Sequence, residues 1–127
     1  MNIFLISPAR NAEPEMQKMI LAYVQGLERD GIAVHWPIRD TEQNDPTGGY
    51  EICRANFTAI LEADEIHLWY DEASSGSKFD MGGVFMLVEM LGVKKRVVIA
   101  NNGEFADDAA KSFLNVFRHL AETTKNS

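Results

Sequence analysis

The sequence predicts a single α/β domain built around a parallel sheet. Its 127 residues fit one domain of ordinary size with one substantial core. Short apolar runs alternate with segments that carry apolar residues at helical spacing, in the order βαβαβαβα. Because parallel crossovers are right-handed and lie over the sheet, this alternation implies helices on both faces of the sheet.

Four apolar runs are predicted to be strands. Residues 3–6 read Ile-Phe-Leu-Ile and are followed by Pro8, which is typical of a short strand covered on both faces. Pro37 closes the second run in the same way. The other predicted strands are residues 32–36, 65–70 and 96–100.

Four segments are predicted to be helices. Residues 16–29 carry one apolar stripe at helical spacing, with Pro14 suited to the first turn and Gly31 to the stop. The other predicted helices are residues 50–63, 78–91 and 106–122, and residues 123–127 are expected to fray. Residues 39–49 form a long polar loop, and long loops in compact domains are often binding loops.

Composition excludes several classes of function. The formal net charge of −7 argues against broad contact with the phosphates of DNA or RNA, although a few local donors can still hold one small anion. The single cysteine, Cys53, excludes an internal disulfide and fits a reducing compartment. The first residues do not resemble a signal peptide, and no apolar run approaches the roughly 20 residues that span a bilayer. A cytoplasmic protein without a membrane partner is expected.

Known cofactor motifs do not occur in the sequence. It contains neither G-x-G-x-x-G after a strand nor the triphosphate-binding G-x-x-x-x-G-K-[ST]. The three histidines, His35, His67 and His119, lack the spacing of metal ligands and are expected to be structural. We therefore expect no metal and no organic cofactor.

The predicted topology places the ligand site at one edge of the sheet. In open parallel sheets ligands bind beyond the carboxyl ends of the strands, where the strand order reverses. Three loops, residues 7–13, 38–49 and 71–77, are expected to meet there.

The segment from Ser74 to Asp80 is the strongest candidate site. Gly76 permits a tight turn and close approach of a ligand, and Ser75 or Ser77 can cap the following helix. Asp80, in the first turn, is expected to be held ionised by the positive end of the helix dipole. An ionised carboxylate beside a polar cradle suits attack on a glycosidic carbon. Ordinary helix capping explains the same pattern without any reaction.

Three further residues belong to the candidate site by position. Arg10 follows the first strand, at the same edge of the sheet, and can pair with a phosphate bidentately. Trp36 and Tyr50 flank the long polar loop and can stack on a base, or serve as packing residues.

At these residues the chain resembles the nucleoside 2-deoxyribosyltransferase superfamily, which includes the 2′-deoxynucleoside 5′-phosphate N-hydrolases. The transferase loop Ser-Gly-Thr-x-x-Glu is similar to Ser75–Asp80. The hydrolase loop Ser-x-Gly-x-Gly-Tyr-Glu, which is followed by x-Gly, is matched at Ser74, Gly76, Phe79, Asp80 and Gly82. The opening Gly-Ser-Ile-Arg of the superfamily resembles residues 7–10, and Ala63-Asp64 before the third strand also looks similar.

The resemblance implies a flavodoxin-like, Rossmann-like three-layer fold, with a mainly parallel sheet of four or five strands in one domain over residues 1–127. It also implies cleavage or transfer of an N-glycosidic bond in a nucleoside or its 5′-monophosphate. Asp80 would be the nucleophile and Asn56 would orient the sugar. Sugar or phosphate would be held by Ser7, Arg10, Ser74, Ser75, Gly76 and Ser77, with Trp36 or Tyr50 against the base.

Two departures from the superfamily keep a second class of function open. Its nucleophile is Glu where this chain has Asp80, and its second site carboxylate is replaced by Asn56, which cannot act as a base. A nucleotide-binding or sensing module without turnover is the alternative. In both cases residues 78–91 are apolar nearly all round, which predicts a homodimer or a higher homo-oligomer formed through that helix. The superfamily, which builds its site at a dimer interface, agrees with this prediction.

Overall fold

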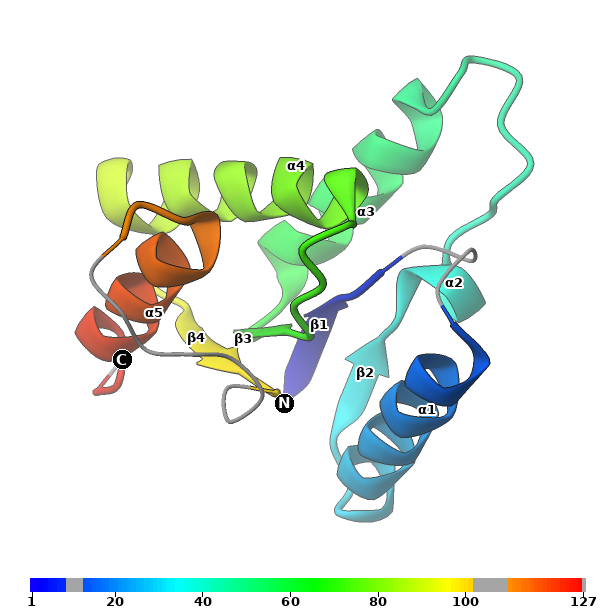
Figure 1. Ribbon diagram of the computed structural model, residues 1–127, viewed down its shortest axis with the longest axis horizontal. Coiled ribbons are helices and arrows are strands. Elements are labelled where there is room, and N and C mark those ends of the chain that lie inside the picture. The colour runs from blue at the N-terminus through cyan, green and yellow to red at the C-terminus, as the bar shows by residue number, and fades with distance from the viewer. Residues whose placement is uncertain (9–12, 102–109, 127) are drawn as a thin grey trace.

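The computed structural model describes residues 1–8, 13–101 and 110–126 (Figure 1). In chain order the elements are β1 (Asn2–Ile6), α1 (Pro14–Arg29), β2 (Ala33–His35), α2 (Pro37–Asp40), α3 (Tyr50–Glu62), β3 (Glu65–Leu68), α4 (Ser75–Phe85), the π-helix η1 (Met86–Met90), β4 (Arg96–Ile99) and α5 (Phe113–Thr123).

The described strands form one parallel sheet in the order β2-β1-β3-β4. Helix α1 covers one face, and α3, α4 and α5 cover the other (Figure 1). The strand order reverses between β1 and β3, because the chain passes from β2 back across β1. The predicted three-layer α/β fold is confirmed, with four strands in the described part of the chain.

Alternation along β1 divides the core into two layers. Successive strand side chains point to opposite faces, so Ile3 and Leu5 pack below α1 whereas Phe4 and Ile6 pack below α3 and α4. All four are at most 2% exposed. Both faces are therefore apolar, which explains the continuous apolar run at this strand.

Several element boundaries differ from those predicted. Helix α4 begins at Ser75, three residues earlier than expected, because Ser74 caps it. The expected long loop begins with the short helix α2. Helix α5 begins at Phe113, because the Ser112 hydroxyl caps it by accepting a hydrogen bond from the Asn115 backbone N–H. Residues 106–109, the start of the predicted helix, lie outside the described residues. The last turn of the predicted third helix is the π-helix η1.

The chain is held to the sheet as far as Thr124, beyond the point where fraying is expected. The Thr124 hydroxyl is buried and accepts a hydrogen bond of 2.9 Å from the Val97 backbone N–H. This contact satisfies a donor on the outer edge of β4, where no further described strand pairs.

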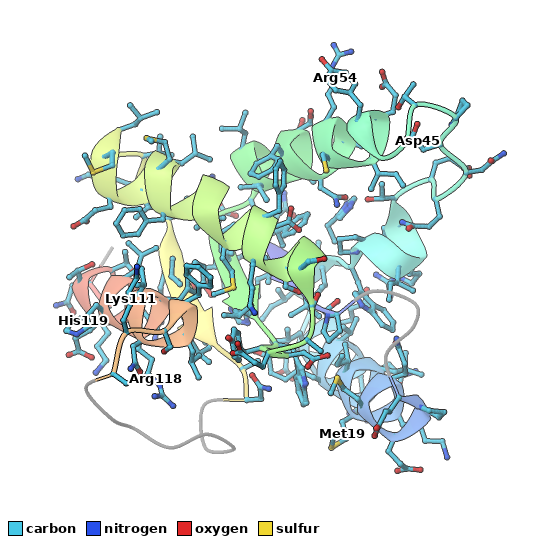
Figure 2. The ribbon with its side chains drawn as sticks, turned by 45° about the horizontal axis from the view of Figure 1, so that its top comes forward. Met19, Asp45, Arg54, Lys111, Arg118 and His119 are labelled. Carbon is cyan, nitrogen blue, oxygen red and sulfur yellow. The ribbon has the colours of Figure 1, made fainter. Side chains whose placement is uncertain are left out.

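His67 is buried in this fold, whereas His119 lies on its surface. His67 lies between Tyr23 of α1 and Glu65 of its own strand, with Nδ1 2.6 Å from the Tyr23 hydroxyl and Nε2 3.0 Å from Glu65 Oε1. His119 is exposed on α5 (Figure 2). Among the described residues no group of three His, Cys, Asp or Glu side chains could hold a metal ion. No described helix is long and apolar enough to cross a bilayer.

Candidate active site

The first turn of α4 is closed by a pair of serines. The Ser74 Oγ accepts a hydrogen bond of 3.2 Å from the Ser77 backbone N–H and donates one of 2.9 Å to the Ser77 Oγ. Both side chains are buried, and Ser75 is exposed. The cap is therefore Ser74, and the prediction that Ser75 or Ser77 caps the helix is wrong. Ser74 is favoured because it is the last extended residue before the helix.

Gly76 lies inside α4 and makes no tight turn, contrary to expectation. Its backbone is helical, and the positive φ angles among the described glycines occur at other positions. A Cβ added at Gly76 would meet nothing within 4 Å. The glycine instead leaves open space at the start of α4, beside exposed Ser75.

Asp80 is a buried carboxyl group with no partner in the described part of the chain. Its side chain is 9% exposed, and desolvation raises its pKa from 3.8 to about 7. The expectation that the helix dipole keeps Asp80 ionised is therefore wrong. Asp80 is the sixth residue after the Ser74 cap, beyond the first turn in which the dipole acts strongly, so loss of water dominates.

Helix α3 packs against α4, the helix that carries Asp80. Burial raises the pKa of the Cys53 thiol, and the charge of Asp80 raises it further, so the two groups interact across the helix boundary. The rings of Phe57 and Phe79 meet edge to face, with centroids 6.0 Å apart. Phe57 also occupies the space beside Gly83, which lets the two helices approach closely. Cys53 and Phe57 thus belong to the part of α3 that lies near α4.

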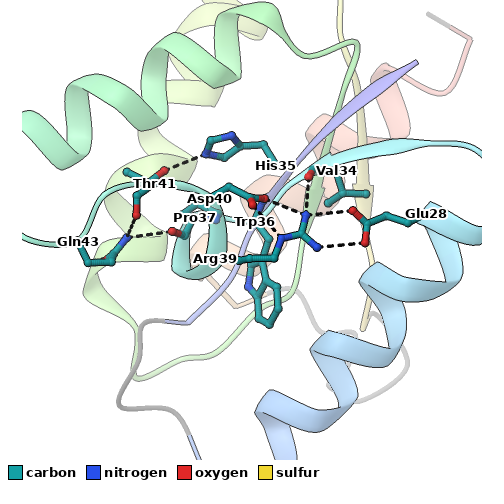
Figure 3. A network of polar contacts seen from close by, with 9 residues as sticks. All are labelled: Glu28, Val34, His35, Trp36, Pro37, Arg39, Asp40, Thr41 and Gln43. Carbon is teal, nitrogen blue, oxygen red and sulfur yellow. Dashed lines mark hydrogen bonds and ion pairs between the residues drawn. The ribbon is translucent and has the colours of Figure 1, made fainter.

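Asn56 is buried on α3, one turn after Cys53. Its amide Oδ1 accepts a hydrogen bond of 2.7 Å from the Thr41 hydroxyl. The Thr41 oxygen is also 2.8 Å from His35 Nε2 (Figure 3). Sequence reasoning missed the participation of Thr41 and His35. No signal in the sequence could have found it, because the three residues come from separate elements that only the fold brings together.

The long loop before α3 supplies a carboxylate, that of Asp45, which accepts hydrogen bonds from backbone N–H groups at the start of the helix. Asp45 Oδ2 accepts hydrogen bonds of 3.1 Å from the backbone N–H groups of Gly49 and Ile52, and Oδ1 accepts from Thr47. Hydrogen bonds, led by that from the Thr47 hydroxyl, lower the pKa of Asp45 to about 2. Figure 2 shows Asp45 at the outer end of α3, far along the helix from the sheet. Of the free N–H groups at this helix end, that of Ile52 is therefore already used by Asp45, and that of Glu51 by Thr47.

The structure separates the two aromatic candidates. Trp36 is 7% exposed and packs below α1, on the opposite face of the sheet from α3 and α4. Its indole N–H donates a hydrogen bond of 3.1 Å to the Ser7 hydroxyl. Strand alternation places Trp36 there, so it is not brought together with Asp80. Tyr50, the first residue of α3, is 67% exposed. Arg10 lies outside the described residues.

A hollow of about 290 Å³ lies beside β2, away from Asp80. Its charged lining includes Arg39, whose guanidinium already binds both carboxylate oxygens of Glu28, the Asp40 carboxylate and the Val34 carbonyl (Figure 3). These contacts attach α2 to α1 and β2. The hollow therefore has no unused cation among its described lining residues that could recognise an anion.

The fold has a counterpart among solved structures. The chain is similar in structure to a 2-deoxyribosyltransferase from the psychrotolerant bacterium Bacillus psychrosaccharolyticus. That enzyme is described as a suitable biocatalyst for the industrial synthesis of antiviral and antitumoral nucleosides. The similarity covers 92% of this chain and 90% of the other, with a TM-score of 0.63 and 17% sequence identity. The two chains share one fold. No protein-family model matches the chain, and no curated protein matches its sequence. The flavodoxin-like fold implied by the sequence resemblance is confirmed.

Proposed function

We propose that this protein cleaves or transfers the N-glycosidic bond of a nucleoside or a nucleoside 5′-monophosphate, with Asp80 as the nucleophile. The observation that carries the proposal is the Asp80 carboxyl on α4, which is buried and has no hydrogen-bond or ion-pair partner among the described residues. A carboxyl group kept away from water without a partner is costly for folding, and such groups cluster at functional sites. The shared fold with a 2-deoxyribosyltransferase supports the same substrate class.

In the proposed reaction the ionised Asp80 carboxylate attacks the anomeric carbon of the sugar. The bond from carbon to base nitrogen breaks, and the base leaves with the electron pair and takes up a proton. A glycosyl ester on Asp80 results, which water hydrolyses or a second base resolves by transfer. Asn56 orients the sugar, and Tyr50 is the exposed one of the two aromatic candidates, Trp36 and Tyr50, for contact with the base.

The residues proposed to hold the sugar or phosphate are those that the superfamily resemblance implies. Ser75 and Gly76 offer open space and backbone donors at the start of α4, beside the Ser74–Ser77 pair. Ser7 and Arg10 are proposed to contact phosphate, and Trp36 supports Ser7 from the core. The cytoplasmic location expected from the sequence remains part of this proposal.

The pH dependence of activity tests the role of Asp80. Because the nucleophile must be ionised and its pKa is raised to about 7, we expect kcat/KM to increase with pH through about 7 and then to level off. Release of free base from a panel of nucleosides and their 5′-monophosphates, followed by chromatography between pH 5 and 9, measures this profile. Absence of release from every member, or release that persists in Asp80→Ala, contradicts the proposal.

A nucleotide-binding module without turnover is the second candidate. The neutral Asn56 amide, at a position where a carboxylate could act as a base, favours it. Stoichiometric binding by calorimetry, with the ligand recovered intact, would support this candidate, and catalytic release of base would exclude it.

We also propose that the protein is a homodimer in which α4 and η1 contact the partner. Phe79, Met86, Met90 and Leu91 are 53–66% exposed along this helical segment. Exposed apolar side chains grouped on one element are typical of an interface. We expect light scattering to give twice the chain mass of 14.2 kDa for the wild type, and the chain mass for Met86→Glu/Met90→Glu.

A matched control is Met19→Glu on α1, on the other side of the sheet (Figure 2). Met19 is 46% exposed, so the change places the same type of charge at a methionine that is also exposed. This variant should keep the mass of the wild type. A monomeric wild type at micromolar concentration would remove the dimer from the proposal.

A further inference from the structure

Thr41 forms a buried bridge between β2 and α3. Its side chain is 7% exposed, and its hydroxyl lies between His35 Nε2, at 2.8 Å, and Asn56 Oδ1, at 2.7 Å. Both distances are those of good hydrogen bonds. The bridge connects an element of the sheet with α3, which packs against the helix that carries Asp80.

The direction of the two bonds follows from the single hydroxyl proton of Thr41. The amide oxygen of Asn56 can only accept, so Thr41 donates its proton to Asn56 Oδ1. The Thr41 oxygen must then accept from an N–H on His35 Nε2. Burial lowers the pKa of His35, which leaves the neutral ring with one N–H. The Nε2–H tautomer completes the bridge.

The position of Thr41 is itself held by its neighbours. Its backbone N–H donates to the Pro37 carbonyl at 3.0 Å, and its carbonyl accepts from Gln43 Nε2 at 3.0 Å (Figure 3). The same Gln43 amide donates to the Pro37 carbonyl at 2.9 Å. Helix α2 is in turn attached to α1 through Arg39 and Glu28. Thr41 therefore does not depend on Asn56 for its own location.

We infer that Thr41 is a positioning residue that fixes the amide of Asn56, with Oδ1 occupied and Nδ2 presented to the ligand as a donor. No described residue accepts a hydrogen bond from Asn56 Nδ2. The ligand group at this point must then be an acceptor, such as a sugar oxygen or a carbonyl of the base. The inference rests on the proposed function for the identity of that ligand, but the orientation of the amide does not.

The tautomer of His35 tests the orientation without any measurement of activity. Long-range ¹H–¹⁵N spectra of the wild type at pH 7.5 are expected to show His35 protonated on Nε2. The same tautomer should persist in Thr41→Ser, which keeps the hydroxyl. A neutral ring protonated on Nδ1 would make Nε2 the acceptor from Thr41, leave no proton for Asn56 Oδ1, and overturn the inference.

The effect of Thr41 on activity is tested by kinetics with a substrate found in the base-release panel. We expect Thr41→Val to lower kcat/KM about tenfold and Thr41→Ser to restore most of it, since one oriented hydrogen bond is lost and regained. Thr58→Val is the matched control, because Thr58 lies exposed on α3 and bonds only to the Arg54 carbonyl. Equal kcat/KM in Thr41→Val and Thr58→Val would overturn the inference. If the wild type cleaves no member of the panel, the proposed function fails, and the His35 tautomer still decides the orientation of Asn56.

Discussion

Replacement of Asp80 by asparagine is expected to abolish base release while making the folded protein more stable above pH 7. The amide cannot act as a nucleophile, so the release rate should drop at least about a thousandfold. Asn is nearly isosteric with a protonated Asp, so the packing of α4 against α3 should be kept. Loss of activity with a gain in stability would separate a chemical role of the carboxyl from a structural one.

The stability difference has a defined pH window. A carboxyl whose pKa is raised from 3.8 to about 7 binds its proton more tightly in the folded than in the unfolded chain. Its contribution to the free energy of unfolding therefore declines as pH rises from about 4 to about 7, and the full penalty remains above that range. At about 1.4 kcal/mol per pKa unit, the penalty is on the order of 4 kcal/mol.

Urea denaturation of the wild type and Asp80→Asn at pH 4.5, 6 and 8 measures this window. The free energy of unfolding of the variant, relative to that of the wild type, should increase as pH rises, and the difference should be largest at pH 8. Asp30→Asn serves as the control for net charge, because Asp30 is exposed at the end of α1, and its stability should stay within about 0.5 kcal/mol of the wild type. A pH-independent difference between Asp80→Asn and the wild type would contradict the raised pKa.

Substitution of Gly83 by alanine should loosen the contact between α3 and α4. An added Cβ would lie 2.1 Å from Cε1 and 2.3 Å from Cζ of Phe57, so the Phe57 ring must leave its place against Phe79. We expect the free energy of unfolding to decrease by about 1–3 kcal/mol, as is typical of overpacking. Because Asn56 and Asp80 lie on the two helices that separate, base release should also decline.

The neighbouring glycine provides the control for this experiment. A Cβ at Gly82 would meet nothing within 4 Å, so Gly82→Ala should stabilise α4 by about 0.5–1 kcal/mol through helix propensity alone. Adding Phe57→Leu to Gly83→Ala should recover part of the lost stability, because the shorter side chain frees the space. Equal stabilities of the two alanine variants, measured by urea denaturation, would contradict the close approach at Gly83.

Sequence reasoning predicted the fold and the helix start that carries the candidate site, because both depend on local patterns. Apolar runs closed by Pro8 and Pro37, alternating with helical stripes, are sufficient to predict a parallel sheet between helix layers. The segment from Ser74 to Asp80 is recognisable as a polar turn before a helix, and it does begin α4. The position of Asn56 in a helix also follows from local periodicity.

The state and surroundings of those residues were decided only by tertiary packing. Asp80 carries a raised pKa because the folded chain buries it, and no local pattern encodes that burial. Trp36 points below α1 because strand pairing sets which face each residue occupies. Thr41 reaches Asn56 across 15 positions of the chain and His35 across 6. Periodicity specifies the conformation of a segment, whereas burial and hydrogen bonding of a side chain depend on residues that are distant in sequence.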